Sequence, residues 1–189
     1  MKSYYEKERH PWGTKVFPFI KYSVKHLKPG KVLSLGGGDG VDNIYLAKKG
    51  FEVTNVDIDP QAIKIFNEDA KKESLTVKSE VSDIADYNFK EKYDNIITLF
   101  TLHFLKRKEA LDLIKKIKLN TKSEGINIII NFTKKGEFDK VNSLQNFYLE
   151  EDELKKLYSN WQIVKHVKMI GKTKSGLKQE REMIVAKKP

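Results

Sequence analysis

From Lys31 onward, short apolar runs alternate with longer stretches in which apolar residues recur at helical spacing. A short apolar run is typical of a buried strand, and the helical spacing is typical of a helix with one buried face. This alternation predicts a parallel sheet whose strands are joined by crossover helices. We expect strands at residues 32–35, 52–56, 75–81, 94–100 and 126–132, and helices at residues 41–49, at 60–72 and around the apolar positions 110, 113, 114 and 117.

The pattern changes after residue 132. Residues 150–158 read as a short charged helix, and residues 161–170 and 182–187 read as two strands joined by the turn-rich segment GKTKSG. These two strands are expected to form an antiparallel hairpin that closes the sheet. The predicted fold is therefore α/β, a Rossmann-like, seven-stranded, mostly parallel sheet with helices on both faces and a C-terminal antiparallel hairpin.

Ahead of the first strand, residues 14–27 are expected to form one helix, with Pro18 near its first turn. Its apolar residues would face the core: Val16, Phe17, Ile20 and Val24.

Composition narrows the class of protein. The chain has 189 residues, which suits one domain, so we expect residues 1–189 to form a single domain in which residues 1–28 are a lid segment and a helix. Because there is no cysteine, disulfide scaffolds, thiolate metal sites and cysteine nucleophiles are excluded, and no metal is expected. The sequence has no apolar run of membrane-spanning length and no secretory signal at its start, which favours a cytoplasmic protein.

The net charge of +10 suggests a nucleic-acid partner, but the distribution of charge argues against one. Only Arg9, Arg107 and Arg181 are arginines, the residue type that reads phosphates and guanine edges in bidentate fashion. The lysines are dispersed along the chain, as on solvated helix faces. We therefore interpret the charge as a lysine-rich surface and do not expect a nucleic-acid partner.

The most informative motif is VLSLGGGDG, residues 32–40, at the end of the first predicted strand. Glycines at this strand-to-helix turn let a ligand approach the backbone closely. Asp57, which ends the next strand, places a carboxylate beside the turn, where it can accept hydrogen bonds from ribose hydroxyls. Val41 stands where a dinucleotide fingerprint starting at Gly36 requires glycine, and no Gly-Lys-Ser/Thr follows, so a nicotinamide dinucleotide and a nucleoside triphosphate are both disfavoured.

These motifs resemble the class I methyltransferases that use S-adenosylmethionine. In that family the glycine turn holds the methionine part of the cofactor, an acid after the second strand binds the ribose, and an acid after the third strand lies beside adenine. The matching acids here are Asp57 and Asp83, and residues 93–105 resemble the fourth-strand motif. The resemblance implies a cofactor site made by Leu35, Gly36, Gly37, Gly38, Gly40, Asp57, Ile58, Asp83, Ile84 and Leu99.

Within this family, the chain is most similar to the tellurite-resistance methyltransferases and their small-molecule relatives. The sequence departs from the family pattern in two places, one in the glycine motif and one in the last hairpin. Ser34 stands where the family usually has an acid that helps to hold the cofactor's ammonium. The segment GKTKSG carries Lys172 and Lys174 instead of the His-Arg pair that the family has in its last hairpin. Ser34 bears on how the cofactor is held, and the lysines in place of the His-Arg pair weaken the expectation of a tellurite or selenite substrate.

Methyl transfer from a sulfonium is an in-line displacement that depends mainly on orientation, so a general base is optional. His103 follows the carboxyl end of the fourth strand, where open α/β sheets bind ligands. It is our catalytic candidate, as an acceptor-orienting residue or base, against the alternative that it only packs. A substrate or lid role is expected for Tyr5, His10, Trp12 and Phe104.

The predicted function is methyl transfer from S-adenosylmethionine to a small molecule such as a chalcogen oxyanion, a thiol or an amine, with S-adenosylhomocysteine as product. RNA or protein methylation and a non-catalytic module that binds S-adenosylmethionine are the alternatives. A nicotinamide-linked oxidoreductase is disfavoured by the glycine spacing. We expect a monomer or homodimer with no membrane contact.

Overall fold

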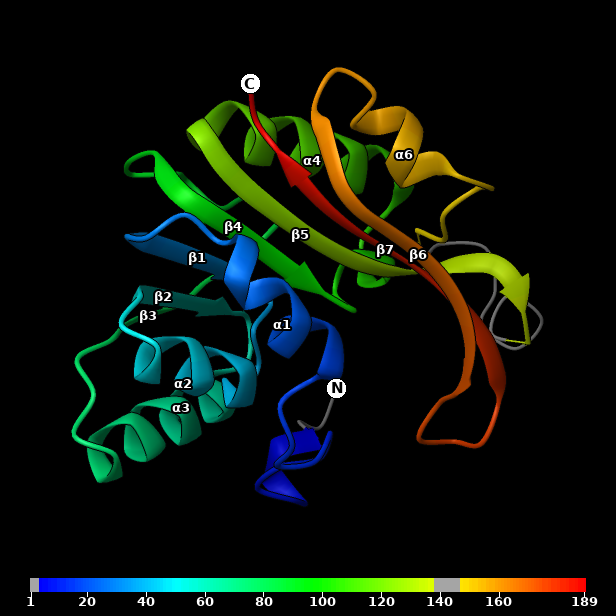
Figure 1. The fold of residues 1–189 in the computed structure, drawn as a ribbon. Coiled ribbons are helices and arrows are strands. Elements are labelled where there is room, and N and C mark those ends of the chain that lie inside the picture. The colour runs from blue at the N-terminus through cyan, green and yellow to red at the C-terminus, as the bar shows by residue number, and fades with distance from the viewer. Residues whose placement is uncertain (1–3, 138–146) are drawn as a thin grey trace.

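The computed structural model describes residues 4–137 and 147–189, and it consists of one twisted sheet covered by helices (Figure 1). The sheet has seven strands in the order β3-β2-β1-β4-β5-β7-β6. The strands are β1 (Lys31–Leu35), β2 (Glu52–Asp57), β3 (Lys78–Val81), β4 (Tyr93–Leu99), β5 (Thr121–Gly136), β6 (Gln162–Lys172) and β7 (Lys178–Lys187).

The sheet is parallel from β3 to β5, and β7 runs antiparallel to both β5 and β6. This arrangement confirms the predicted fold class, including the hairpin that closes the sheet. The chain reverses its strand order between β1 and β4, and in open parallel sheets ligands bind beyond the carboxyl ends of the strands at such a point.

Helices cover both faces of the sheet (Figure 1). The helices are α1 (Pro18–Ser23), α2 (Val41–Lys48), α3 (Pro60–Lys72), α4 (Arg107–Asn120) and α6 (Glu153–Leu157), and short 3-10 turns lie at η1 (Tyr4–Glu6), η2 (Val24–His26) and η3 (Leu102–Phe104). Buried residues of α1, α2 and α3 belong to one core cluster with Val32 and Ile128, whereas those of α4 and α6 belong to a second cluster with Leu33 and Ile129. Neighbouring strand residues thus feed opposite faces, as buried parallel strands require.

The N-terminal helix is shorter than the sequence suggested. It begins at Pro18, not at residue 14, because a proline disfavours the helical conformation of the residue before it. Phe17 accordingly has φ −62° and ψ 129°, which is extended backbone. The last turn of the expected helix is the 3-10 turn η2, and the prediction of residues 14–17 as helical was wrong.

Other boundaries also differ. The third strand starts at Lys78 and not at residue 75, and the last helix covers only Glu153–Leu157. β5 and the hairpin strands are longer than expected, because β5 pairs with β7 as far as Gly136 and β7 pairs with β6 from Lys178 onward. Lys172 therefore ends a strand and does not lie in the connecting turn.

Candidate cofactor and acceptor site

The glycine turn between β1 and α2 is fixed to the neighbouring strand. The backbone N–H groups of Gly36 and Gly37 donate to the Val56 carbonyl at 2.7 and 3.2 Å, and Asn55 Nδ2 donates to the Gly38 carbonyl at 3.0 Å. Gly36, Gly38 and Gly40 have φ of 67°, 55° and 74°, a region that residues with a Cβ rarely adopt.

Close approach is a second reason for glycine at this turn. A Cβ on Gly36 would lie 2.1 Å from Thr101 Cγ2, and one on Gly40 would lie 2.1 Å from Phe66 Cδ2. Thr101 Oγ1 also donates to the Gly36 carbonyl at 3.1 Å. Phe66 of α3 therefore packs against one end of the turn, and Thr101, the residue before η3, holds the other end.

Asp57 ends β2 beside this turn, as predicted. Its carboxylate accepts hydrogen bonds from the N–H of Gly38 at 2.7 Å and from the N–H of Asp59 at 3.0 Å. Burial raises the pKa of Asp57, and these two backbone bonds partly offset the effect. A carboxylate has about four acceptor positions, so the backbone bonds leave room for a ligand's hydroxyl group.

The ends of β2 and β3 expose apolar surface next to Asp57. Ile58 is 64% exposed and Val81 is 52% exposed, and Asp57 is paired with Val81 in the strand register. Asp83 is also exposed, and it accepts from the N–H of Ala85 at 2.9 Å. Ile84, in contrast, is 6% exposed and belongs to the core. Of the predicted cofactor residues here, Ile58 and Asp83 are therefore at the surface, whereas Ile84 is in the interior.

Leu35 is fully buried at the end of β1, and Leu99 is partly buried at the end of β4. Both strand ends flank the glycine turn, because β1 pairs with β2 on one side and with β4 on the other. Ser34, which replaces the usual acid, is also buried, and its Oγ would lie 2.7 Å from a Cβ on Gly37.

The N-terminal segment, residues 4–13, covers the glycine turn. A Cβ on Gly38 would lie 2.3 Å from the Tyr5 hydroxyl oxygen, so this tyrosine sits directly on the turn. Burial and the nearby carboxylates of Asp39 and Asp57 raise the pKa of Tyr5. The structure thus brings the predicted lid residue Tyr5 to the predicted cofactor-binding glycines.

Ion pairs hold the N-terminal segment from two sides. Arg9 pairs with Glu68 at 2.8 Å and with Asp69 at 2.5 Å on α3, and His10 Nδ1 lies 2.9 Å from Asp39 Oδ2. From the β6–β7 connection, Lys174 Nζ pairs with Glu8 at 2.7 Å and donates to the Pro11 carbonyl at 2.6 Å.

Trp12, the remaining predicted lid residue of this segment, is 58% exposed. Its ring lies 5.4 Å from that of Tyr4, and Lys174 Nζ is 6.0 Å from its centroid. More than half of the Trp12 side chain is therefore exposed, whereas Tyr5 and His10 contact residues of the turn.

His103 lies in η3, just beyond the end of β4. Its ring lies tilted against that of Phe104 at 4.1 Å and makes an edge contact with that of Phe132 at 4.9 Å, and its backbone N–H donates to Asn131 Oδ1 at 3.1 Å. Burial lowers the pKa of His103 to about 4, an effect that Asn131 opposes. The imidazole is therefore neutral at pH 7, with a buried Nδ1 that has no hydrogen-bond partner, while Phe104 is 66% exposed.

An aromatic surface continues from His103 toward the N-terminal segment. Phe132 lies 5.2 Å from Phe100, and Phe100 makes an edge contact with Phe17 at 5.4 Å. Arg181 on β7 lies with its guanidinium carbon 5.6 Å from the Phe100 centroid. Burial lowers the pKa of Arg181, no described carboxylate counters that shift, and its Nε has no hydrogen-bond partner.

Sequence reasoning missed Thr101, Val81, Phe100 and Arg181. Phe100 has φ 53°, an unusual conformation for an aromatic residue, and it changes the direction of the chain after β4. The residue type at position 100 does not indicate this conformation. Arg181 could have been singled out as one of only three arginines, placed directly before the strand predicted at residues 182–187. Its partners across the sheet depend on strand order and could not be predicted.

The fold is similar to that of solved methyltransferase structures. The crystal structure of TehB from Haemophilus influenzae matches with a TM-score of 0.84 over 98% of this chain and 66% of that chain, at 28% identity. Magnesium protoporphyrin IX methyltransferase from Synechocystis PCC 6803, solved with bound S-adenosylhomocysteine, matches with a TM-score of 0.70 over 90% of this chain and 80% of that chain, at 19% identity. The chain has the class I methyltransferase fold.

Residues 1–183 match the family model described as tellurite resistance protein TehB, and the chain belongs to that family. A curated relative from Haemophilus influenzae, named "Probable S-adenosyl-L-methionine-dependent methyltransferase TehB", is 31% identical over 149 residues, which are 79% of this chain and 52% of that protein. The chain spans about half the length of the curated relatives it matches first. The resemblance to S-adenosylmethionine-dependent methyltransferases of the tellurite-resistance group is thereby confirmed.

Each helix in the described part of the chain is too short or too polar to cross a bilayer.

Proposed function

We propose that this chain transfers the methyl group of S-adenosylmethionine to a small-molecule acceptor. The proposal of a small acceptor rests on the N-terminal segment, residues 4–13, which lies over the glycine turn. Tyr5 contacts Gly38, and ion pairs of Arg9 and Lys174 hold the segment on two sides. We expect that, with a cofactor on the turn, a segment held in this way admits a small acceptor more readily than an RNA strand or a folded protein.

Asp57 would hold the cofactor's ribose with the acceptor positions that its two backbone bonds leave free. The adenine would lie on the exposed apolar side chains of Ile58 and Val81, with Asp83 at its edge. Apolar walls with a few fixed polar groups are what small-ligand sites generally provide. The methionine part would then lie over Gly36 and Gly38, beside Tyr5.

The acceptor would bind on the aromatic surface formed by Phe100, Phe132 and His103. Arg181 faces this surface without a carboxylate partner among the described residues, so it can balance the charge of an anion. This favours an anionic acceptor such as a chalcogen oxyanion or a thiolate over an amine. The family's description, tellurite resistance, agrees with an oxyanion.

The proposed reaction needs little acid–base catalysis from the protein. A lone pair of the acceptor attacks the methyl carbon, the carbon–sulfur bond breaks, and its electron pair stays on sulfur. An acceptor that arrives as an anion needs no base, and His103, with a pKa of about 4, would be a weak one at pH 7. We therefore assign His103 to positioning the aromatic surface, and orientation to most of the rate enhancement.

The test is a turnover assay that measures S-adenosylhomocysteine formed from S-adenosylmethionine, with tellurite, selenite, a small thiol, a small amine and RNA offered separately. We expect turnover with an anionic or thiol acceptor, reduced at least about tenfold by Arg181→Met. The matched control is Arg107→Met, since Arg107 pairs with Glu153 on the helical face formed by α4 and α6. Turnover with RNA alone, or cofactor binding without turnover, would contradict the proposal.

A further inference from the structure

A second cluster of polar side chains lies on the face of β7 opposite to Arg181. Adjacent residues of a strand point to opposite faces, so Glu182 turns toward α6 while Arg181 turns toward Phe100. Glu182, His166 on β6 and Asp152 just before α6 each offer a ligand atom, and these three atoms lie within 4.8 Å of one another. His166 Nε2 lies 2.8 Å from Glu182 Oε1 and 4.0 Å from Asp152 Oδ1.

Glu182 is the unusual member of the cluster. Its side chain is 0% exposed, yet only one of its two carboxylate oxygens has hydrogen-bond partners. Oε1 lies 2.8 Å from His166 Nε2 and accepts a long hydrogen bond from the backbone N–H of Lys155 at 3.4 Å, whereas Oε2 has no hydrogen-bond partner. A buried carboxylate oxygen without a partner is costly, and it calls for an ion, a water or a proton that satisfies it. The cluster as it stands is therefore incomplete.

We propose that Asp152, His166 and Glu182 bind a divalent transition-metal ion of the Zn²⁺ type. One imidazole and two carboxylates form the mixed nitrogen and oxygen set that such ions accept. Ligands about 2.1 Å from a tetrahedral ion lie about 3.4 Å apart, a value between the 2.8 and 4.0 Å separations that His166 makes here. Asp152 is 40% exposed, so its carboxylate can rotate inward to complete the set.

Lys168 forms an ion pair with Asp152 and balances its negative charge. Its Nζ lies 2.9 Å from Asp152 Oδ1 and 3.6 Å from Glu151 Oε1, so it can stay with Glu151 when a metal takes Asp152. Because Lys168 competes for the same carboxylate, its removal should tighten metal binding. A purely structural charge network would instead lose stability without Lys168 and would gain no affinity for metal.

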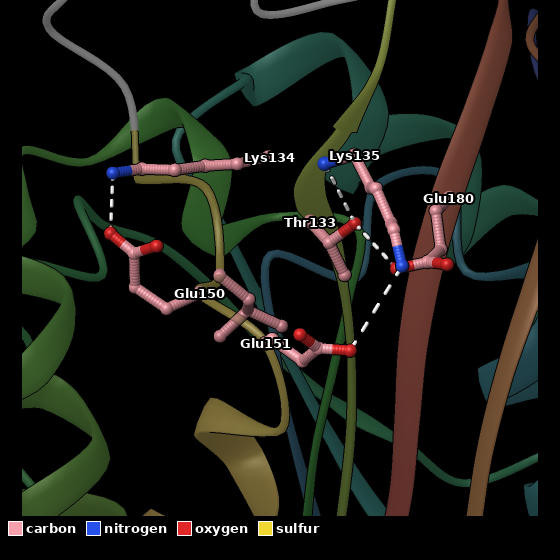
Figure 2. Close-up of a pocket in the computed structure, with 7 residues that line it drawn as sticks. Thr133, Lys134, Lys135, Glu150, Glu151 and Glu180 are labelled. Atoms are coloured by element: carbon pink, nitrogen blue, oxygen red, sulfur yellow. Dashed lines mark hydrogen bonds and ion pairs between the residues drawn. The ribbon is translucent and has the colours of Figure 1, made fainter.

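A cavity lies beside Glu150 and Glu151, the two residues that precede Asp152 in the chain. Figure 2 shows the neighbouring cavity, of about 220 Å³, in which Glu151 and Glu180 face Lys135 and Thr133. Glu151 precedes Asp152, and Glu180 lies two residues before Glu182 on the same face of β7. The acidic residues of this cavity would draw a cation toward the three ligands.

The experiment is calorimetric titration of the purified full chain with Zn²⁺, together with elemental analysis after dialysis. We expect one ion per chain, binding weakened more than about tenfold by Glu182→Gln, and binding tightened by Lys168→Met. The matched control is Glu73→Gln, the same change at an exposed glutamate that pairs with Lys48 after α3, which should leave the affinity within about twofold. S-adenosylhomocysteine affinity should be the same in all variants, because the described hydrogen bonds and ion pairs of the cluster do not reach the glycine turn.

Two outcomes would overturn the metal site. One is absence of stoichiometric Zn²⁺ binding by the unaltered chain. The other is equal affinity in the unaltered chain and in Glu182→Gln, which would place the ion elsewhere. If Glu182→Gln fails to fold by circular dichroism, His166→Gln provides the same test, since His166 is partly exposed and Gln keeps a polar end.

Discussion

At the scale of single residues, the glycine turn offers a matched pair of substitutions. Gly40 has φ 74° and no room for a Cβ beside Phe66, whereas Gly50 has φ 88° with open space around it. Gly50→Ala should therefore cost only the left-handed backbone strain, about 1–2 kcal/mol of unfolding free energy. Gly40→Ala should cost clearly more, because the ring must also move. Urea unfolding measures both, and equal losses would refute the close packing at Gly40.

His103 makes stability depend on pH. Its pKa is about 4 in the folded chain and about 6.5 in the unfolded chain, so between these values only the unfolded chain takes up the proton. The free energy of unfolding should therefore fall as pH drops from 6.5 to 4, by about 3 kcal/mol from this residue, with no further loss from it below pH 4. His103→Gln should remove this part of the slope and leave the slope above pH 7 unchanged. Urea unfolding at a series of pH values tests it, and an identical slope in both proteins would refute the burial argument.

At the scale of elements, the N-terminal segment is the part whose motion should matter most for the cofactor. Tyr5→Ala removes the ring over Gly38. S-adenosylhomocysteine should then dissociate at least about tenfold faster, because the contacts of a partly buried aromatic side chain are lost. Tyr4→Ala is the matched control, because Tyr4 is 59% exposed and contacts Trp12. Stopped-flow displacement measures both rates. Equal rates in the two variants would mean that the segment does not cover the bound cofactor.

Most elements could be predicted from the sequence because local signals coincide with buried positions. The position of the glycine turn and of the Asp57 carboxylate could be predicted from residue type and spacing, and the structure brings the two into contact. Boundaries failed where long-range pairing decides them: β7 extends back to Lys178 because β6 and β5 lie on either side of it. The start of α1 at Pro18 was predictable in principle, since the residue before proline avoids helix.

The candidate acceptor surface could be predicted only in part. His103 was found from its place after β4, but its burial between Phe104 and Phe132 depends on how β5 packs beside η3. Arg181 and Phe100 meet across three strands whose order in the sheet is not their order in the chain. Such contacts are set by topology and leave no periodic signal in the sequence.

At the scale of the whole molecule, the charge of +10 is spread over a surface where many lysines already have acidic partners. Examples are Lys48 with Glu73 at 2.7 Å and Lys90 with Glu80 at 2.8 Å. Binding to single-stranded RNA should therefore be non-specific and should disappear near physiological salt. Filter binding from low to physiological salt measures this. Retention of tight binding at physiological salt would favour the RNA alternative instead.

The central claim is that the glycine turn and Asp57 bind S-adenosylmethionine and its product. Calorimetric titration with S-adenosylhomocysteine, with NAD as the contrasting ligand, tests it most directly. We predict micromolar binding of S-adenosylhomocysteine alone, weakened about a hundredfold by Asp57→Ala, because two hydrogen bonds to a charged acceptor are lost. Asp112→Ala, an exposed aspartate of α4, should bind as the unaltered chain does. Binding of NAD, or an affinity that Asp57→Ala leaves unchanged, would contradict the account.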